Sequence, residues 1–106
     1  MAATFYHQLQ TLLDDGLTVA VATIVNVKGS TPREVGAKMI IHPYGKHIGT
    51  VGGGCGEHEI VKHALDVLRT GEARLIHLDM SNDVAEEEGM VCGGRMKVWI
   101  EPFTAE

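Results

Sequence analysis

The sequence of 106 residues predicts an α+β fold, with a mixed sheet of about five strands and two main helices in one compact domain. Segments with helical spacing of apolar residues alternate along the chain with β-branched segments, an order typical of packed α and β layers. A hydrophobic content of 44% suffices for a core in a chain of this length. Aromatic residues are few, so we expect a core of Val, Ile, Leu, Met and Ala.

Two helices are expected from the 3.6-residue periodicity. The first covers about residues 4–15, where Phe5 and Leu9 share one face and Gly16 is suited to end the helix. The second covers about residues 57–70 and is followed by a glycine. Its expected buried face consists of Ile60, Val61, Ala64, Leu65 and Leu68.

Five segments predict strands. Residues 17–28 are β-branched and almost wholly apolar, which predicts a strand buried on both faces and therefore central in the sheet. The turn PYGK after the second strand predicts a hairpin. The other four strands are expected at residues 37–42, 47–51, 73–80 and 95–103.

Composition narrows the class of protein. The formal net charge of −5 argues against nucleic-acid binding, which needs clustered basic residues. No segment has the pattern of a signal peptide or the length of a membrane span. Two cysteines are too few for a disulfide scaffold, so we expect a cytoplasmic protein with reduced thiols.

The stretch GTVGGGCGEHEIVKHAL surrounds Cys55 with glycines just before the second helix. The dinucleotide-binding fingerprint fails, because its third glycine falls on Glu57, and the phosphate-binding loop fails for want of a lysine. Backbone N–H groups at such a strand-to-helix turn still favour anions, and a helix N-terminus favours the thiolate. The alternatives are a tight, closely packed connection and a buried Cys55 that serves as a small apolar residue.

Two other loops carry related features. Cys92 also lies among glycines, in GMVCGGRM, so the two cysteines would share a site if their loops lie at one edge of the sheet. The loop GSTPRE carries Arg33, a planar donor for phosphate or carboxylate, or else a solvated surface residue. Zinc bound by Cys55, His58 and Cys92 is a further alternative, although structural zinc sites usually have two tight ligand pairs.

Together these loops resemble the N-terminal domain of the XdhC/CoxI family. The matching segments are GSTPREVGAKMII, GKHIGTVGGGCGEHEIV and GMVCGGRMKVWIEP, in this order, and the resemblance covers about residues 17–102. Where the usual family pattern reads Cys-Val-Glu, this chain has Cys55, Gly56 and Glu57.

The resemblance implies a cofactor chaperone that is not an enzyme. Such a protein binds molybdenum cofactor, protects it during sulfuration and delivers it to a molybdenum hydroxylase such as xanthine dehydrogenase or carbon monoxide dehydrogenase. No resident metal is implied, but the Cys55 thiolate would suit the molybdenum of the cofactor. The cofactor-binding residues implied by the motifs are Ser30, Arg33, Gly52, Gly53, Gly54, Cys55, Glu57, Cys92, Gly93 and Gly94.

The resemblance also sets expectations about partners. These are the hydroxylase apoenzyme, a cysteine desulfurase or a separate protein with a Rossmann-like domain, and a second copy in a homodimer. Longer family members carry a Rossmann-like domain after this one, so residues 1–106 are expected to be a stand-alone domain. Two other functions stay open: a structural partner protein without cofactor contact, and a small thiol redox or sulfur-transfer protein that uses Cys55 and Cys92.

Overall fold

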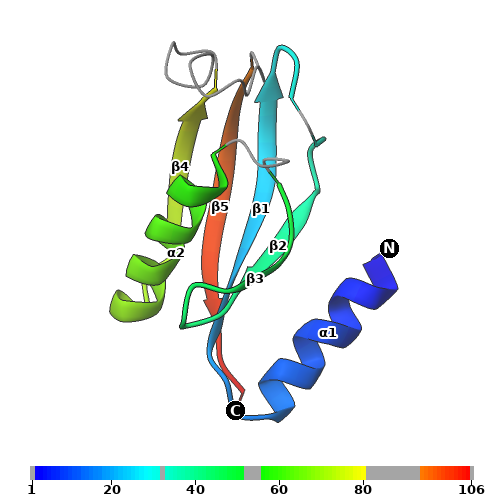
Figure 1. Ribbon diagram of the computed structural model, residues 1–106, viewed down its shortest axis with the longest axis vertical. Helices are drawn as coiled ribbons and strands as arrows, with labels where there is room; N and C mark the ends of the chain where they lie inside the picture. Colours follow the sequence, from blue (N-terminus) through cyan, green and yellow to red (C-terminus); the bar gives the residue numbers. More distant parts are fainter. Residues whose placement is uncertain (1, 32, 52–55, 81–93, 106) are drawn as a thin grey trace.

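The computed structural model describes residues 2–31, 33–51, 56–80 and 94–105. Within these ranges the chain forms two helices and one five-stranded sheet, which confirms the α+β fold (Figure 1). All seven elements lie within two residues of their expected bounds. They are α1 (Ala2–Asp14), β1 (Val19–Lys28), β2 (Lys38–Ile41), β3 (His47–Gly49), α2 (Glu57–Thr70), β4 (Arg74–Asp79) and β5 (Arg95–Phe103).

The strands lie in the order β3-β2-β1-β5-β4. The expected central position of β1 is confirmed, and β2 and β3 form the expected hairpin. The expectation of a mixed sheet is wrong, because all four strand pairings are antiparallel. The reason is the path of the chain: α2 carries it from β3 at one edge to β4 at the other, so this helical crossover joins strands that are not neighbours.

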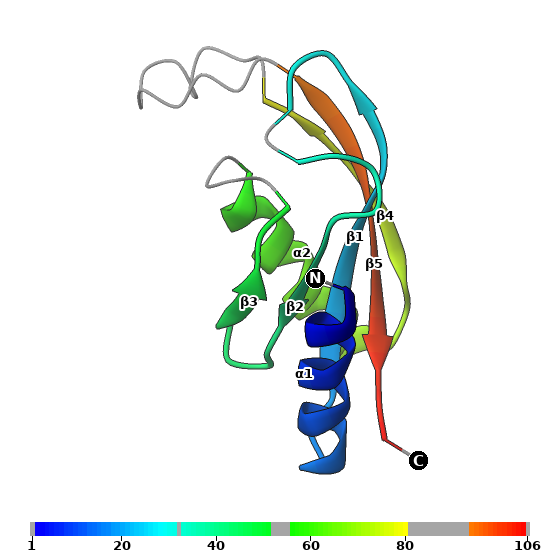
Figure 2. The ribbon, with the colours of Figure 1, turned by 90° about the vertical axis from the view of Figure 1, so that its right-hand side faces the viewer.

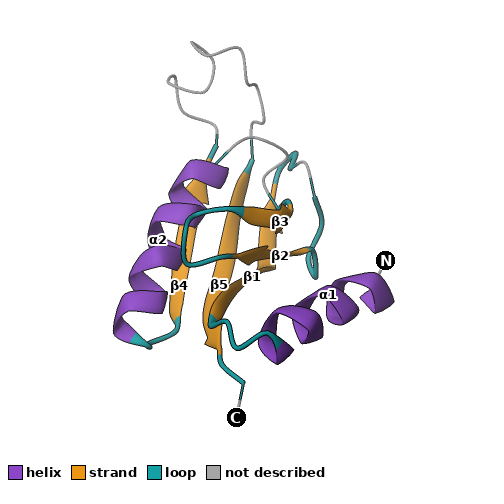
Figure 3. Ribbon diagram, turned by 60° about the horizontal axis from the view of Figure 1, so that its bottom comes forward, coloured by secondary structure: helices purple, strands orange, loops and turns teal. Residues whose placement is uncertain are grey.

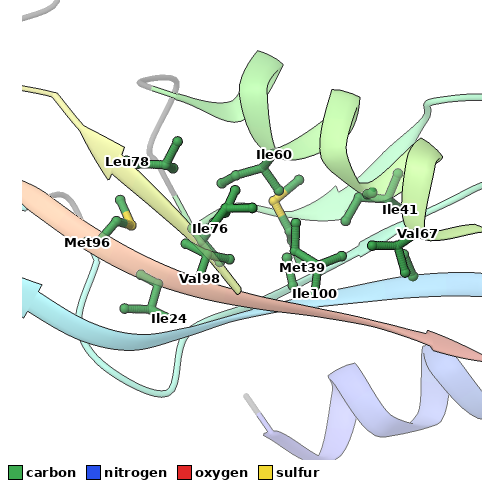
Figure 4. Packing of buried hydrophobic residues seen from close by; sticks show 14 of the residues in the cluster. Ile24, Met39, Ile41, Ile60, Val67, Ile76, Leu78, Met96, Val98 and Ile100 are labelled. Atoms are coloured by element: carbon green, nitrogen blue, oxygen red, sulfur yellow. The ribbon is translucent and has the colours of Figure 1, made fainter. Parts of the chain in front are cut away.

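The main core lies between the sheet and α2 (Figure 2). Alternate residues of β1, β4 and β5 point to this side, as the two-residue period of a strand requires. Figure 4 shows their side chains meeting those of α2 and β2. The largest fully buried side chains of this core include Ile24, Met39, Ile41, Ile60, Met96 and Ile100.

The buried face of α2 differs from the expected one at two positions, Leu65 and Val67. Ile60, Ala64 and Val67 are fully buried, whereas Leu65 is 37% exposed. At 3.6 residues per turn, Leu65 lies roughly 140° around the helix from Ile60. Val67 lies only roughly 20° from Ile60 on the same scale, so it faces the sheet where Leu65 cannot.

The second face of the sheet is only partly covered. α1 packs through Leu9 against Val19, Val21 and Ile40, with other apolar residues of α1 around them. Figure 3 shows α1 on the β1–β2 side of the sheet and α2 along β4. The outer face of β4 and β5 therefore carries neither of the two described helices, as Figure 2 also shows.

A polar cluster holds the end of α2 against the start of β4. Nη1 of Arg74 lies 2.9 Å from Nδ1 of His63 and 3.5 Å from Oδ2 of Asp66. Partial desolvation tends to raise the pKa of Asp66. The hydrogen bond and positive charge of Arg69, together with those of Arg74, hold this pKa below its ordinary value.

Replacing Ile60 by alanine should destabilise the protein by about 2–5 kcal/mol, because it leaves a cavity in the main core. The same change at Leu65 should cost less than about 1 kcal/mol, since that side chain already contacts solvent. Urea unfolding of both variants measures the two costs. Equal costs would contradict the helix orientation described above.

Candidate functional site

Three element ends lie side by side at one end of the sheet. Lys28, the last residue of β1, is paired with Arg95, the first residue of β5, and Arg95 is paired with Asp79 at the end of β4. The loop that carries Ser30 and Arg33 follows β1 directly. The segment that carries Cys92 joins β4 to β5, so the sheet brings the flanks of two predicted loops to one end (Figure 1).

Gly94 shows how closely these flanks approach. A Cβ atom built on Gly94 would overlap the carbonyl oxygen of Ser30 and lie 2.6 Å from Cγ2 of Thr31. The carbonyl oxygen of Gly94 also accepts a hydrogen bond of 2.8 Å from the backbone N–H of Met80. Only glycine fits this contact, which joins the first predicted loop to the third.

Arg33 connects the first loop to the second. Its Nη1 donates a hydrogen bond of 3.0 Å to the carbonyl oxygen of Thr50, just before the glycine-rich stretch. The Thr31 hydroxyl donates to the carbonyl oxygen of Arg33 at 2.9 Å and so stabilises this turn. Arg33, Lys38 and Phe5 also line a cleft of about 490 Å³ between α1 and the β2–β3 hairpin.

Gly56 forms the turn into α2. Its φ of +75° lies in the left-handed region, and an added Cβ would come within 3.2 Å of Cδ1 of Leu78. A β-branched residue is strained in that conformation, so glycine suits this turn and a valine would not.

Glu57 is the first residue of α2, where the helix dipole favours a negative charge. Its side chain is only 18% exposed, and its Oε1 lies 3.8 Å from Nε2 of His47. The other oxygen, Oε2, is buried and accepts no hydrogen bond from the part of the chain that the structure describes. Sequence reasoning missed His47, because a lone histidine on a short strand carries no motif.

Four of the predicted site residues are described. Ser30, Arg33 and Gly94 are linked by the contacts above, and Glu57 begins α2 after the second loop. The remaining predicted site residues lie outside the described ranges; they are Gly52, Gly53, Gly54, Cys55, Cys92 and Gly93.

The zinc alternative rests mostly on residues outside the described ranges. Cys55 and Cys92 are among these, and His58 lies at the start of α2. Among the described residues, no three His, Cys, Asp or Glu side chains are grouped as metal ligands would be. Neither described helix is long and apolar enough to cross a membrane.

Comparison with known proteins defines the class. The model of the XdhC and CoxI family matches residues 12–79, more than half of the chain, and this chain belongs to that family. The sequence is 34% identical, over 96% of its length, to a Bacillus subtilis protein named as a probable xanthine dehydrogenase component. It is 40% identical over 76% of its length to Escherichia coli YqeB, an uncharacterized protein.

Two further matches agree with this family. The molybdenum cofactor insertion chaperone PaoD of Escherichia coli is 33% identical over 60% of this chain. A crystal structure of a xanthine dehydrogenase from Bacillus halodurans superposes with a TM-score of 0.74 and 31% identity over 91% of this chain. The chain spans 15–32% of the length of the curated relatives and 29% of the crystallised chain.

Changing Gly94 to alanine should displace the Ser30–Thr31 backbone, because the new methyl group overlaps it. We expect the amide resonances of Ser30 and Thr31 to shift and stability to fall by about 1–3 kcal/mol, the usual cost of overpacking. Gly71→Ala is the control for the resonances: its φ of +77° makes alanine strained there too, so stability should also fall, but nothing lies within 4 Å of its added Cβ and the Ser30 and Thr31 resonances should not move. Unmoved Ser30 and Thr31 resonances in Gly94→Ala would contradict the close contact.

Proposed function

We propose that this chain binds molybdenum cofactor and acts as a non-catalytic accessory domain in the maturation of molybdenum hydroxylases of the xanthine dehydrogenase or carbon monoxide dehydrogenase type. The family membership and the relative named as a molybdenum cofactor insertion chaperone support this function. The main structural support is that residues flanking the three predicted loops are in contact. Gly94 lies against Ser30, and Arg33 donates a hydrogen bond to Thr50.

The described residues suit the chemistry of such a cofactor. Its pterin ring presents N–H donors, and the buried Oε2 of Glu57 is an acceptor without a partner among the described residues. Its phosphate is anionic and suits the guanidinium of Arg33. When bound, the cofactor holds the molybdenum with which the client enzyme carries out its redox chemistry.

Other residues complete the proposed site. Gly52, Gly53, Gly54 and Gly93 would let the backbone approach the cofactor closely. The thiolates of Cys55 and Cys92 are soft ligands that would suit molybdenum, and Cys55 directly precedes the turn into α2. In this proposal the chain binds and orients the cofactor and excludes water from it, while the reaction belongs to the client enzyme.

The partners follow from the same proposal. The hydroxylase apoenzyme would receive the cofactor in the cytoplasm, and a cysteine desulfurase would supply the sulfur while the cofactor is bound. A homodimer, or a separate protein with a Rossmann-like domain, would close the site from outside. Residues 1–106 would act as a cofactor-binding domain in their own right.

The test is the binding of isolated molybdenum cofactor under anaerobic conditions to the wild type and to Arg33→Ala, Cys55→Ser and Cys92→Ser. We expect saturable binding, about tenfold or more weaker in Arg33→Ala, because a charge-assisted hydrogen bond is lost. Binding should be lost in both cysteine variants. Arg69→Ala, at the far end of α2, is the matched control and should bind as the wild type does.

The contrary outcomes separate the other functions. A wild type that binds no cofactor but still associates with a hydroxylase would indicate a purely structural partner of that enzyme. By contrast, a reversible disulfide between Cys55 and Cys92, which needs Cα atoms within about 7 Å, would indicate a thiol redox or sulfur-transfer protein.

A further inference from the structure

Exposed basic residues are aligned on the outer face of the sheet, away from α2. One row of paired positions across β1, β5 and β4 is Lys28, Arg95 and Asp79. The next row on the same face is Asn26, Lys97 and His77. All six residues are exposed and line a cleft of about 470 Å³.

A β-bulge directs β1 side chains into this cleft. Before the bulge, even-numbered residues of β1 such as Ala22 and Ile24 face α2. The register shifts between Ile24 and Asn26, after which Val27 packs on the α2 side and Asn26 and Lys28 lie in the rows of the outer face. Bulges often redirect side chains at functional sites, and here the bulge directs Lys28 away from the core.

The charge of the cleft is opposite to that of the whole chain. Lys28, Arg95 and Lys97 are three cations beside one carboxylate, Asp79, in a chain with a formal net charge of −5. Asp79 Oδ2 lies 3.5 Å from Nε of Arg95. Lys28 and Arg95 are directly opposite each other, and like charges in that position destabilise a sheet. A bound anion would reduce this repulsion.

An aromatic surface adjoins the cations. Trp99 lies two residues beyond Lys97 on the same face, a separation of roughly 7 Å along the strand. Its cross-strand neighbours are Thr23 and Leu75, and both Trp99 and Leu75 are exposed. Neither described helix covers this part of the sheet (Figure 2). The face thus offers an apolar ring surface directly beside a basic cleft.

We propose that the outer-face cleft binds the phosphate groups of a small organic phosphate whose organic part lies over Trp99. Lys28, Arg95 and Lys97 donate to the phosphate oxygens, and the Asn26 amide adds an uncharged donor. The concave shape and the size of the cleft favour a small molecule over an extended acidic partner. α2, which begins at Glu57, packs on the other side of the sheet, whereas Lys28 and Arg95 adjoin the loops that carry Ser30 and Gly94; the test therefore uses phosphate probes and not molybdenum cofactor.

Trp99 makes the proposal testable, because it is the single tryptophan of the chain. Inorganic pyrophosphate and a nucleoside diphosphate are titrated against the wild type, with tryptophan fluorescence and calorimetry as readouts. Both probes should bind, and the nucleoside diphosphate should bind more tightly and quench Trp99 further. Lys28→Gln and Lys97→Gln should each weaken binding about tenfold, the usual effect of losing a charge-assisted contact.

Matched controls separate this cleft from general charge effects. Lys62→Gln removes the same charge from the exposed side of α2 and should leave affinity unchanged. Lys97→Arg should retain binding, and circular dichroism checks that every variant is folded. Equal losses in Lys62→Gln and Lys97→Gln would overturn the proposal, as would no binding of either probe at millimolar concentration.

Two further outcomes concern the nature of the ligand. Binding of a polyglutamate peptide without binding of pyrophosphate would overturn the small-molecule proposal in favour of an acidic protein partner. Equal affinity for pyrophosphate and the nucleoside diphosphate, with no change in Trp99 fluorescence, would overturn the role of Trp99. None of these probes is molybdenum cofactor. If none of them binds as expected, the outer-face proposal is wrong while the proposed function is unaffected.

Discussion

Burial of β1 on both faces is the constraint on which the rest of the structure depends. Val19 and Val21 contact the α1 side, while Ala20 and Ala22 contact the α2 side, so neither surface of this strand can be left in water. Antiparallel β2 and β5 satisfy its backbone hydrogen bonds on both edges. Each helix then covers the apolar surface that this strand and its neighbours present.

The same arrangement determines where the loops lie. Since β1 and β4 both end where β5 begins, the described residues that flank these strand ends, among them Ser30, Met80 and Gly94, lie at one end of the sheet. Close approach there is possible because Gly94 has no side chain to separate it from Ser30. Gly94 thus allows two segments that are far apart in the sequence to come into contact, and the proposed cofactor site relies on this contact.

The two faces of the sheet differ in chemical character. The α2 side is the apolar core, with the carboxylate of Glu57 at the start of the helix. The outer side of β4 and β5 carries cations next to Trp99 and has neither described helix over it. The bulge in β1 determines which residues lie on each face at this end of the strand. Because of it, Lys28 points to the outer face while Val27 packs against the core.

The sequence by itself determined the features that depend on local period: two helices, five strands, the central position of β1, and the motifs that identify the family. Only the tertiary structure decided the features that depend on pairing between distant segments. These include the antiparallel edge strands, the contact of Gly94 with Ser30, and the bulge that exposes Lys28. The expected buried face of α2 includes Leu65 and omits Val67, although the helical period already places Val67 close to Ile60 and Leu65 roughly 140° away, so this difference needed no tertiary information. The periodicity of apolar residues along the chain indicates which side chains share one face of a helix or strand. Strand pairing and register depend on contacts between distant segments, which no local sequence pattern encodes.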